Sequence, residues 1–327
     1  MARTSPRRRA LLGGAVLAAV LAGGTTGAAA GDIGGAIAPG AAAATGATSA
    51  VVACEPDLAA ARVMNGAAGG EPKLFPDNEA KAYGVLPDKP TMPSGSVTVE
   101  TVVHSISDHQ LSAAEKARKE AMIKAQMDVL NASFAGKTAP GAADTPFRFK
   151  LAKVDWVVNA DWYHVSPGKA ERDMKRALYV GDSETLNVYS ADIGGGLLGW
   201  AYFPKDYNFG RDYIDGVVML DESMPGGTAG KYAEGDTLTH EVGQWLMLHH
   251  TFNAGCSASG DFVADTPKEA YPQFNCPVGA DSCAAPGLDP IHNFMDYSQD
   301  SCMNMFTQGQ ADRMSDGWLA FRAGGRG

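Results

Sequence analysis

The stretch that decides the fold runs His240-Glu241-Val242-Gly243-Gln244-Trp245-Leu246-Met247-Leu248-His249-His250. It follows the zinc-site spacing H-E-x-x-H-x-x-G-x-x-H, in which histidines four residues apart share one helix face and can bind one metal ion. The glutamate then takes a proton from water at the metal, and a glycine lets the helix end in a left-handed turn before a third histidine. His240, Glu241 and His250 occupy the expected positions.

Two positions depart from this spacing. Gln244 stands where the second histidine is expected, and an amide oxygen is a weaker zinc donor than imidazole. Met247 replaces the glycine, so either a left-handed turn costs about 1–2 kcal/mol or the helix continues and displaces His250. His249 falls about half a turn from the ligand face of a continued helix, and we expect it at the rim of the site.

Composition sets the class of protein. The 327 residues are 45% hydrophobic and 20% charged, which is typical of a globular protein with one large or two modest domains. The formal net charge of −10 argues against a nucleic-acid partner, because phosphate binding requires excess positive charge.

The N-terminus indicates export. Four arginines precede an apolar run over 10–22 that is too short to span a bilayer, and the small residues at 28–30 suit cleavage after Ala30. Arg8 and Arg9 fit both the general secretory and the twin-arginine route. We therefore expect a signal peptide over 1–30, a low-complexity leader and pro-segment over 31–95, and a catalytic domain over 96–327, in a secreted, extracellular protein without a membrane anchor.

Hydrophobic periodicity predicts an α+β fold: a mixed sheet with helices, then an irregular region of some 60 residues rich in Pro, Gly, Cys and Asp. Ser112 with Glu115 forms a capping box, and Thr307 is a candidate N-cap. The expected strands are Val97–Ile106, Phe147–Leu151, Leu186–Tyr189, Leu197–Phe203 and Ile214–Leu220, and the expected helices are Asp57–Val63, Ser112–Phe134, Lys169–Leu178, Asp236–Leu246 and Thr307–Arg322.

Further short motifs accompany the helix motif in a fixed order. They are Leu197-Leu198-Gly199-Trp200-Ala201, Cys256, Asp265-Thr266-Pro267, Cys276-Pro277, Asn293-Phe294-Met295-Asp296-Tyr297-Ser298, Cys302-Met303, Phe306-Thr307, Gln310 and Arg313-Met314. Together they resemble the pappalysin family of metzincin zinc metalloproteases, over about 96–321. The resemblance implies a metzincin-type domain with a twisted mixed sheet, an active-site helix and an irregular, disulfide-stapled C-terminal subdomain.

The resemblance also implies roles for single residues. His240, Gln244 and His250 would bind Zn²⁺, and Glu241 would act as general base. Met295 would be the Met-turn methionine beneath the metal, and Tyr297 would stabilise the oxyanion.

Residues outside the metal site receive roles in the same way. Gly199 and Trp200 lie in a strand that would pair with an extended substrate. Asp300 would line the S1′ pocket and favour Lys or Arg after the scissile bond. Cys54, in the pro-segment, is a candidate latch whose thiolate would occupy the fourth zinc position, although an ordinary free thiol is equally compatible with the sequence.

Paired cysteines and loop acids complete the implied features. The family's disulfides would be Cys256–Cys283 and Cys276–Cys302, which would hold together a region with few apolar residues. Relatives bind Ca²⁺ near this segment, where Asp261, Asp265 and Thr266 offer oxygen ligands; solvated loop acids are the alternative reading.

We expect a monomer whose partners are peptide or protein substrates. Two alternative functions are compatible with the sequence. The first is a secreted zinc metalloendopeptidase, weakened by Gln244. The second is a catalytically impaired homologue that serves as a secreted peptide-binding protein. The retained Glu241, Tyr297 and Cys54 favour the first, because a binding protein needs no base, oxyanion donor or latch. The missing second histidine favours the second.

Overall fold

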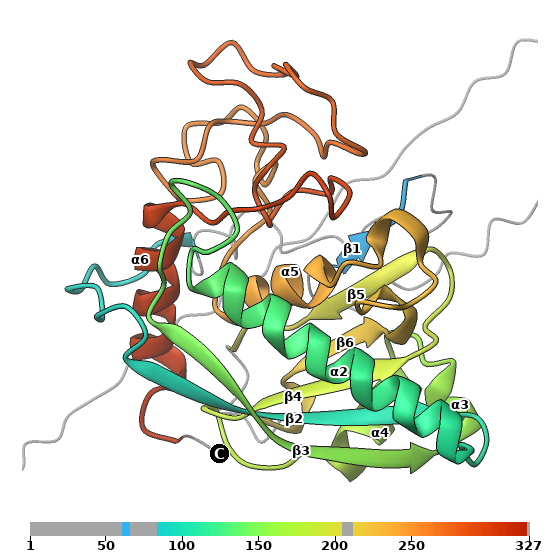
Figure 1. Cartoon of the computed structure of the whole chain (residues 1–327). Helices are drawn as coiled ribbons and strands as arrows, with labels where there is room; N and C mark the ends of the chain where they lie inside the picture. The colour runs from blue at the N-terminus through green and yellow to red at the C-terminus, as the bar shows by residue number, and fades with distance from the viewer. Residues whose placement is uncertain (1–60, 66–83, 205–211, 326–327) are drawn as a thin grey trace, which may run out of the picture. The chain divides into compact units, whose positions relative to one another are not determined.

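The computed structural model describes residues 61–65, 84–204 and 212–325 (Figure 1). The labels below are those of Figure 1. The strands are β1 (Ala61–Val63), β2 (Val97–Ser107), β3 (Phe147–Val158), β4 (Leu186–Ala191), β5 (Leu197–Ala201) and β6 (Val217–Leu220). The helices are α2 (Ala113–Phe134), α3 (Ala160–Tyr163), α4 (Lys169–Leu178), α5 (Asp236–Trp245) and α6 (Gln308–Gly317), the last continued by a π-helical turn over Trp318–Arg322.

The six strands form one mixed sheet in the order β1-β5-β6-β4-β2-β3. Strands β3, β2, β4 and β6 are mutually parallel, whereas β5 and β1 are antiparallel to their neighbours. The mixed sheet confirms the predicted α+β class, and every predicted strand is present at nearly its expected position. One expectation is wrong: residues 61–63, predicted to be helical, form a strand, because pairing with β5 outweighs weak local helix propensity.

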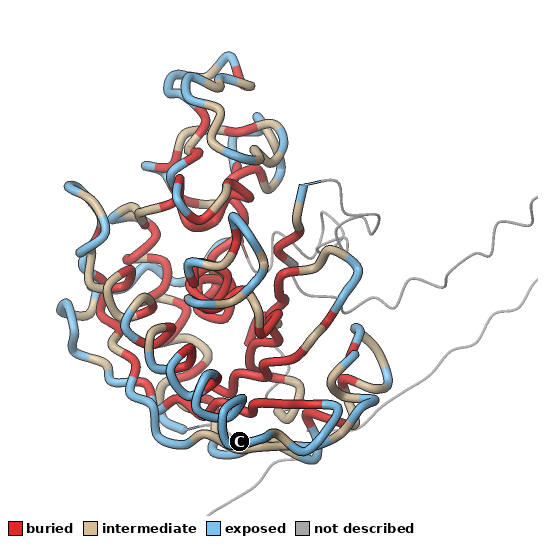
Figure 2. The backbone as a smooth tube through the Cα atoms, turned by 45° about the vertical axis from the view of Figure 1, so that its right-hand side comes forward, coloured by how far each residue is buried: buried red, intermediate tan, exposed pale blue. Residues whose placement is uncertain are grey.

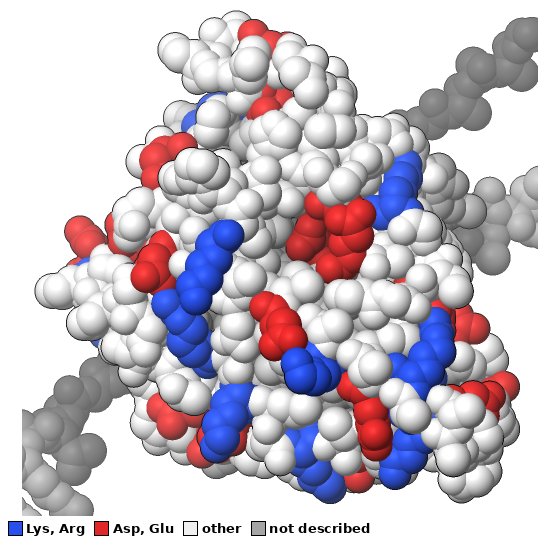
Figure 3. Space-filling model, in the orientation of Figure 1, with Lys and Arg blue, Asp and Glu red and all other residues white. Residues whose placement is uncertain are grey.

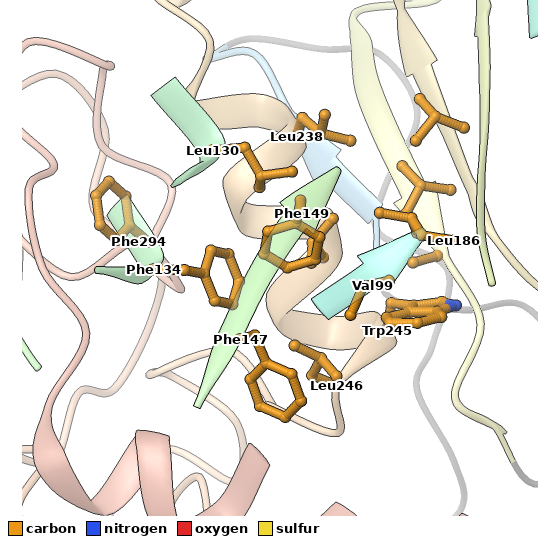
Figure 4. Close-up of a cluster of buried hydrophobic side chains, with 14 of the residues drawn as sticks. Val99, Leu130, Phe134, Phe147, Phe149, Leu186, Leu238, Trp245, Leu246 and Phe294 are labelled. Carbon is orange, nitrogen blue, oxygen red and sulfur yellow. The ribbon is translucent and has the colours of Figure 1, made fainter. Parts of the chain in front are cut away.

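The main core lies between α2, the sheet and α5 (Figure 4). Helix α2 crosses one face of the sheet and buries Leu130 and Phe134, while its outer face is exposed (Figure 2). The capping box predicted at Ser112 and Glu115 is formed. Because α5 is buried along its whole length in this core, the side chains that it presents are held in fixed positions.

Helix α5 ends at Trp245, and the chain then turns left-handed at Met247 with φ of 77°. The backbone N–H of Leu248 donates to Gly243 O at 2.9 Å and that of Met247 to Gln244 O at 2.8 Å, which is the Schellman pattern. Of the two possibilities left by the missing glycine, the strained turn is therefore the one observed. Gly317 makes room for the Met247 side chain, since a Cβ there would lie 2.7 Å from Met247 Cγ.

Residues 246–307 contain no regular helix or strand, and two disulfides cross-link this segment. Both expected pairings, Cys256–Cys283 and Cys276–Cys302, are confirmed. Thr307 caps α6 as predicted. On the face shown in Figure 3, charged side chains of both signs are mixed over the lower part. Within the described ranges, none of the helices has the length and apolar character needed to cross a bilayer.

Candidate active site

Three side-chain nitrogens meet at one point beside α5. The distance from Nε2 of His240 to Nε2 of His250 is 3.1 Å, and Nε2 of Gln244 lies 3.2 Å and 2.7 Å from them. All three residues are buried. The left-handed turn at Met247 brings His250 back toward the helix, so the turn and the helix together assemble the triad.

The donor set fits a zinc ion. In tetrahedral zinc sites the ligand atoms lie about 2.0–2.1 Å from the metal, hence about 3.3 Å from one another, close to the distances found here. The oxygen and nitrogen of a glutamine amide are assigned from hydrogen bonding, so rotation of the Gln244 amide places its oxygen toward the same point. In that orientation two imidazoles and one amide oxygen would supply three protein ligands to the ion.

The histidines are held in the form that binds metal. Nδ1 of His240 donates to the backbone O of Phe294 at 2.6 Å, which directs Nε2 toward the shared point. Burial lowers the pKa of His240 well below its usual value and lowers the pKa of His250 to about 3. Neutral imidazole is the ligand form, so both rings are prepared for a cation without first losing a proton.

Glu241 lies against β5 at Gly199. A Cβ at Gly199 would fall 2.9 Å from Glu241 Cγ, so only glycine allows this approach. Burial raises the pKa of Glu241 well above its usual value, opposed by a hydrogen bond from the backbone N–H of Arg62 to Oε1 at 3.2 Å. The carboxyl thus sits between the triad's helix and the strand expected to hold a substrate.

The residues of the Met-turn lie beneath and beside the triad. The sulfur of Met295 would be 2.5 Å from a Cβ at Gly243, so this methionine packs directly under α5. The hydroxyl of Tyr297 is 3.4 Å from Nε2 of His250, and the two rings meet edge to face. A tyrosine O–H at this distance can donate to an oxygen atom held at the triad.

Asp300 lies at the start of α5. Its Oδ2 accepts hydrogen bonds from the backbone N–H groups of Glu234, Gly235 and Asp236, at 2.9, 3.2 and 3.4 Å. Its Oδ1 forms a fully buried ion pair with Nη2 of Arg62 at 3.0 Å. The helix start and Arg62 therefore fix the position of this carboxylate.

Other candidates have different environments. The Trp200 side chain is buried on the opposite side of β5, where Nε1 donates to Glu171 at 2.7 Å, so only its backbone faces a strand partner. His249 was expected at the rim but is buried between the rings of Phe203 and Phe262. Cys54 and the expected signal peptide, residues 1–30, lie outside the described residues.

The expected calcium ligands differ in their partners. Asp265 accepts hydrogen bonds from the Thr307 hydroxyl at 2.7 Å and from Gly309 N at 2.9 Å, and so holds the start of α6. Asp261 is buried, and burial raises the pKa of its carboxyl to about 7. Among the described residues, the only close group of three or more Cys, His or acidic ligands is Cys276, His292 and Cys302, whose two cysteines form a disulfide.

Sequence reasoning missed the role of Arg62. Nothing around Ala61–Val63 marks it, because its importance comes from pairing with β5 and with Asp300, far away in the chain. The one feature of the sequence that could have indicated this role is Asp300, because a buried acid requires a basic partner.

Comparison with known proteins agrees with this geometry. Residues 179–319 match the family described as peptidase M43, pregnancy-associated plasma protein-A. Extracellular metalloprotease 1 of Coccidioides posadasii is 43% identical over 230 residues, covering 70% of this chain and 79% of that protein. An extracellular metalloprotease of Pyricularia oryzae is 40% identical over 248 residues, 75% of this chain and 82% of that protein.

Two solved structures of related enzymes are also similar to this chain. Mature mirolysin of Tannerella forsythia, in complex with a cleaved peptide, is 29% identical with a TM-score of 0.58, over 68% of this chain and 91% of that one. A promirolysin mutant from the same organism is 26% identical with a TM-score of 0.60, over 75% of this chain and 86% of that one.

The fold, the triad and the Met-turn define a metzincin-type zinc metalloendopeptidase. The chain belongs to the peptidase M43, or pappalysin, family, and it is a secreted enzyme that acts on peptides or proteins. The alternative of an inactive peptide-binding homologue is not favoured by these relatives.

Proposed function

We propose that the chain hydrolyses peptide bonds at a zinc site formed by His240, Gln244 and His250, and that it prefers a basic residue after the scissile bond. The observation that carries the proposal is the convergence of three ligand atoms within 3.2 Å of one another, beside the carboxyl of Glu241. The chemistry that zinc supplies when bound is polarisation of a carbonyl and acidification of a water molecule.

The protein's own groups perform the remaining steps. The backbone of β5 holds the substrate in extended form, as β1 is held. Glu241 accepts a proton from the attacking water and delivers it to the leaving nitrogen. The Tyr297 hydroxyl, 3.4 Å from Nε2 of His250, donates to the carbonyl oxygen as negative charge develops there.

Specificity would come from Asp300. Its carboxylate is buried and fixed by three backbone N–H groups, and it already pairs with the guanidinium of Arg62. An apolar side chain in the same place would leave this charge without a partner, which is a strong penalty in a buried site. Peptides with Arg or Lys after the scissile bond are therefore the proposed substrate class.

Calcium binding and the oligomeric state are further parts of the proposal. We propose one Ca²⁺ near Asp261 and Thr266. Their Oδ2 and Oγ1 atoms are buried and have no hydrogen-bond partner in the part of the chain that the structure describes, and a hard cation would satisfy both. We further propose that the enzyme acts as a monomer, without nucleic-acid or membrane partners.

Replacing Glu241 tests the function directly. Cleavage of an unfolded protein by the natural chain should fall at least about 100-fold in Glu241→Gln, which keeps the shape but removes the base. A chelator should abolish cleavage in the natural chain. Activity that survives both treatments would place the chemistry elsewhere.

A further inference from the structure

We propose that Glu171 is a positioning residue for substrate binding, which fixes strand β5 from the face of the sheet opposite the active-site helix. Because Glu171 is fully buried on that face, it acts through the side chains of Trp200 and Tyr202 and does not touch the substrate. The inference rests on the proposed pairing of an extended substrate with β5. It adds a determinant of peptide binding outside both the zinc site and the surroundings of Asp300.

Strand β5 receives limited support from its neighbours. Residues 199–201 pair with β6, and the other edge of β5 is the one where β1 lies and where a substrate is expected. Three glycines with positive φ, at 194–196, precede the strand, and a Cβ added at Gly194 or Gly195 would have open space around it within the described part of the chain. Side-chain contacts therefore supply much of what holds β5 in place.

The two oxygens of the Glu171 carboxylate hold two side chains of this segment. The indole Nε1 of Trp200 donates to Oε1 at 2.7 Å, and the hydroxyl of Tyr202 donates to Oε2 at 2.9 Å. Because residues two apart in an extended chain point to the same face, both side chains reach the same carboxylate. These two contacts, at separate points along the chain, oppose a shift of β5 along its axis and a rotation about it.

Lys175, one turn further along α4, fixes the carboxylate itself. Its Nζ lies 3.0 Å from Oε1 of Glu171, donates to the backbone O of Ile214 at 2.8 Å and lies 4.6 Å from the centre of the Tyr202 ring. Both charged side chains are fully buried. Replacing such a pair with apolar residues is often neutral for stability, because the attraction must first offset the loss of hydration. These properties favour a positioning role over a purely stabilising one.

The same strand meets the catalytic carboxyl on its other face. Gly199 approaches Glu241 so closely that a Cβ there would lie 2.9 Å from Glu241 Cγ, whereas the side chain of the next residue, Trp200, contacts Glu171. The backbone of β5 is thus held between two carboxyl groups, one on each face. Backbone hydrogen bonds need donor and acceptor within about 2.7–3.2 Å, so a small displacement of β5 weakens every bond to a paired peptide.

The experiment uses the full exported chain and two peptides with the same residues at the scissile bond. The long peptide can pair with the whole of β5, and the short peptide contains only the residues that flank the scissile bond. We expect kcat/KM to be higher for the long peptide, and the ratio of the two values measures the contribution of pairing with β5. Strand β1 competes with both peptides for the same edge, so its occupancy cancels in this ratio.

The main variant combines Glu171→Gln with Lys175→Met. Glutamine offers one oxygen in place of two, so the contact with Trp200 or with Tyr202 is lost, and methionine avoids leaving a lone buried ammonium. The ratio should fall at least about tenfold, the equivalent of about one or two hydrogen bonds. The fall should come from a higher KM for the long peptide, while kcat for each peptide stays within about twofold of the natural value.

Two further variants complete the test. Tyr202→Phe removes one hydrogen bond and leaves the charge pair, so it should show a smaller fall in the ratio. Ser112→Ala is the matched control, because it removes the capping box of α2 and lowers stability at an exposed helix start. Its ratio should equal that of the natural chain. Cleavage of the short peptide by the double variant shows that this variant is folded.

The outcomes separate the two claims. An unchanged ratio in the double variant, a fall in the ratio produced by kcat, or an equal fall in Ser112→Ala overturns the role of Glu171 and leaves the proposed function in place. If the double variant cleaves neither peptide, Tyr202→Phe decides, and an unchanged ratio there overturns the inference. Equal kcat/KM values for the two peptides with the natural chain overturn the pairing with β5 and this inference with it. A natural chain that cleaves neither peptide overturns the proposed function as well.

Discussion

The side-chain amide nitrogen of Gln244 lies 2.7 Å from Nε2 of His250, closer than the two histidine nitrogens lie to each other. The glutamine therefore occupies the position of an imidazole, and the helix and turn around it keep the geometry of a three-ligand site. In the proposed site, Gln244 would give zinc a weaker third donor than a histidine would.

Gln244→His should bind zinc about 10–100-fold more tightly than the natural chain, because imidazole is the better donor. Zinc content after dialysis against a mild chelator measures the difference. Gln308→His, on the exposed surface of α6, is the control for simply adding a histidine. Equal retention by the natural chain and Gln244→His would show that residue 244 is not a ligand.

Asp300→Asn should remove the preference for a basic residue after the scissile bond. The ratio of kcat/KM for matched peptides with Arg or Leu at that position should fall at least about tenfold. Asparagine keeps the size and can still accept from the start of α5, whereas Asp300→Ala would also leave those N–H groups unpaired, at a cost of about 1–3 kcal/mol. An unchanged ratio in Asp300→Asn would assign selectivity to other residues.

Gly317→Ala should lower the free energy of unfolding by about 1–3 kcal/mol, because the new Cβ would lie 2.7 Å from Met247 Cγ. The same change in a Met247→Gly background should cost much less, since the conflicting side chain is absent. Urea unfolding of the four proteins gives the coupling energy. Strictly additive effects would mean that the two residues do not compete for this space.

Stability should fall as the pH rises. Burial, followed by the charge of Asp296, raises the pKa of Glu269 to about 9. The protonated carboxyl therefore stabilises the fold fully below its unfolded pKa of about 4.3, and this contribution is lost as the pH rises toward 9.

The matched variant for this pH dependence is Glu269→Gln, which cannot titrate. Its free energy of unfolding, measured by urea denaturation in the presence of a calcium chelator, should decline less between about pH 5 and pH 9 than that of the natural chain. Parallel curves for the two proteins would rule out Glu269 as the source.

Much of the fold could be predicted from the sequence because its signals are local. The capping box of Ser112 and Glu115 and the bounds Lys169–Leu178 follow from spacing alone, and the structure reproduces both. The closeness of His240 and Gln244 was predictable for the same reason, since residues four apart on a helix share a face.

The missed features depend on contacts between distant segments. Residues 61–63 have no strong strand pattern, and they form a strand only because the edge of β5 is open to them. His249 is two residues beyond Met247, so its burial depends on how the strained turn is resolved. Neither outcome could be derived from neighbouring residues.

The most direct test of the zinc site is to add zinc to the metal-free natural chain while following cleavage of an arginine-containing peptide. We predict that activity rises from zero and saturates near one bound zinc per chain, and that His250→Ala stays inactive throughout. Cleavage without zinc, or no cleavage by the natural chain once zinc is bound, would contradict a metal held by His240, Gln244 and His250.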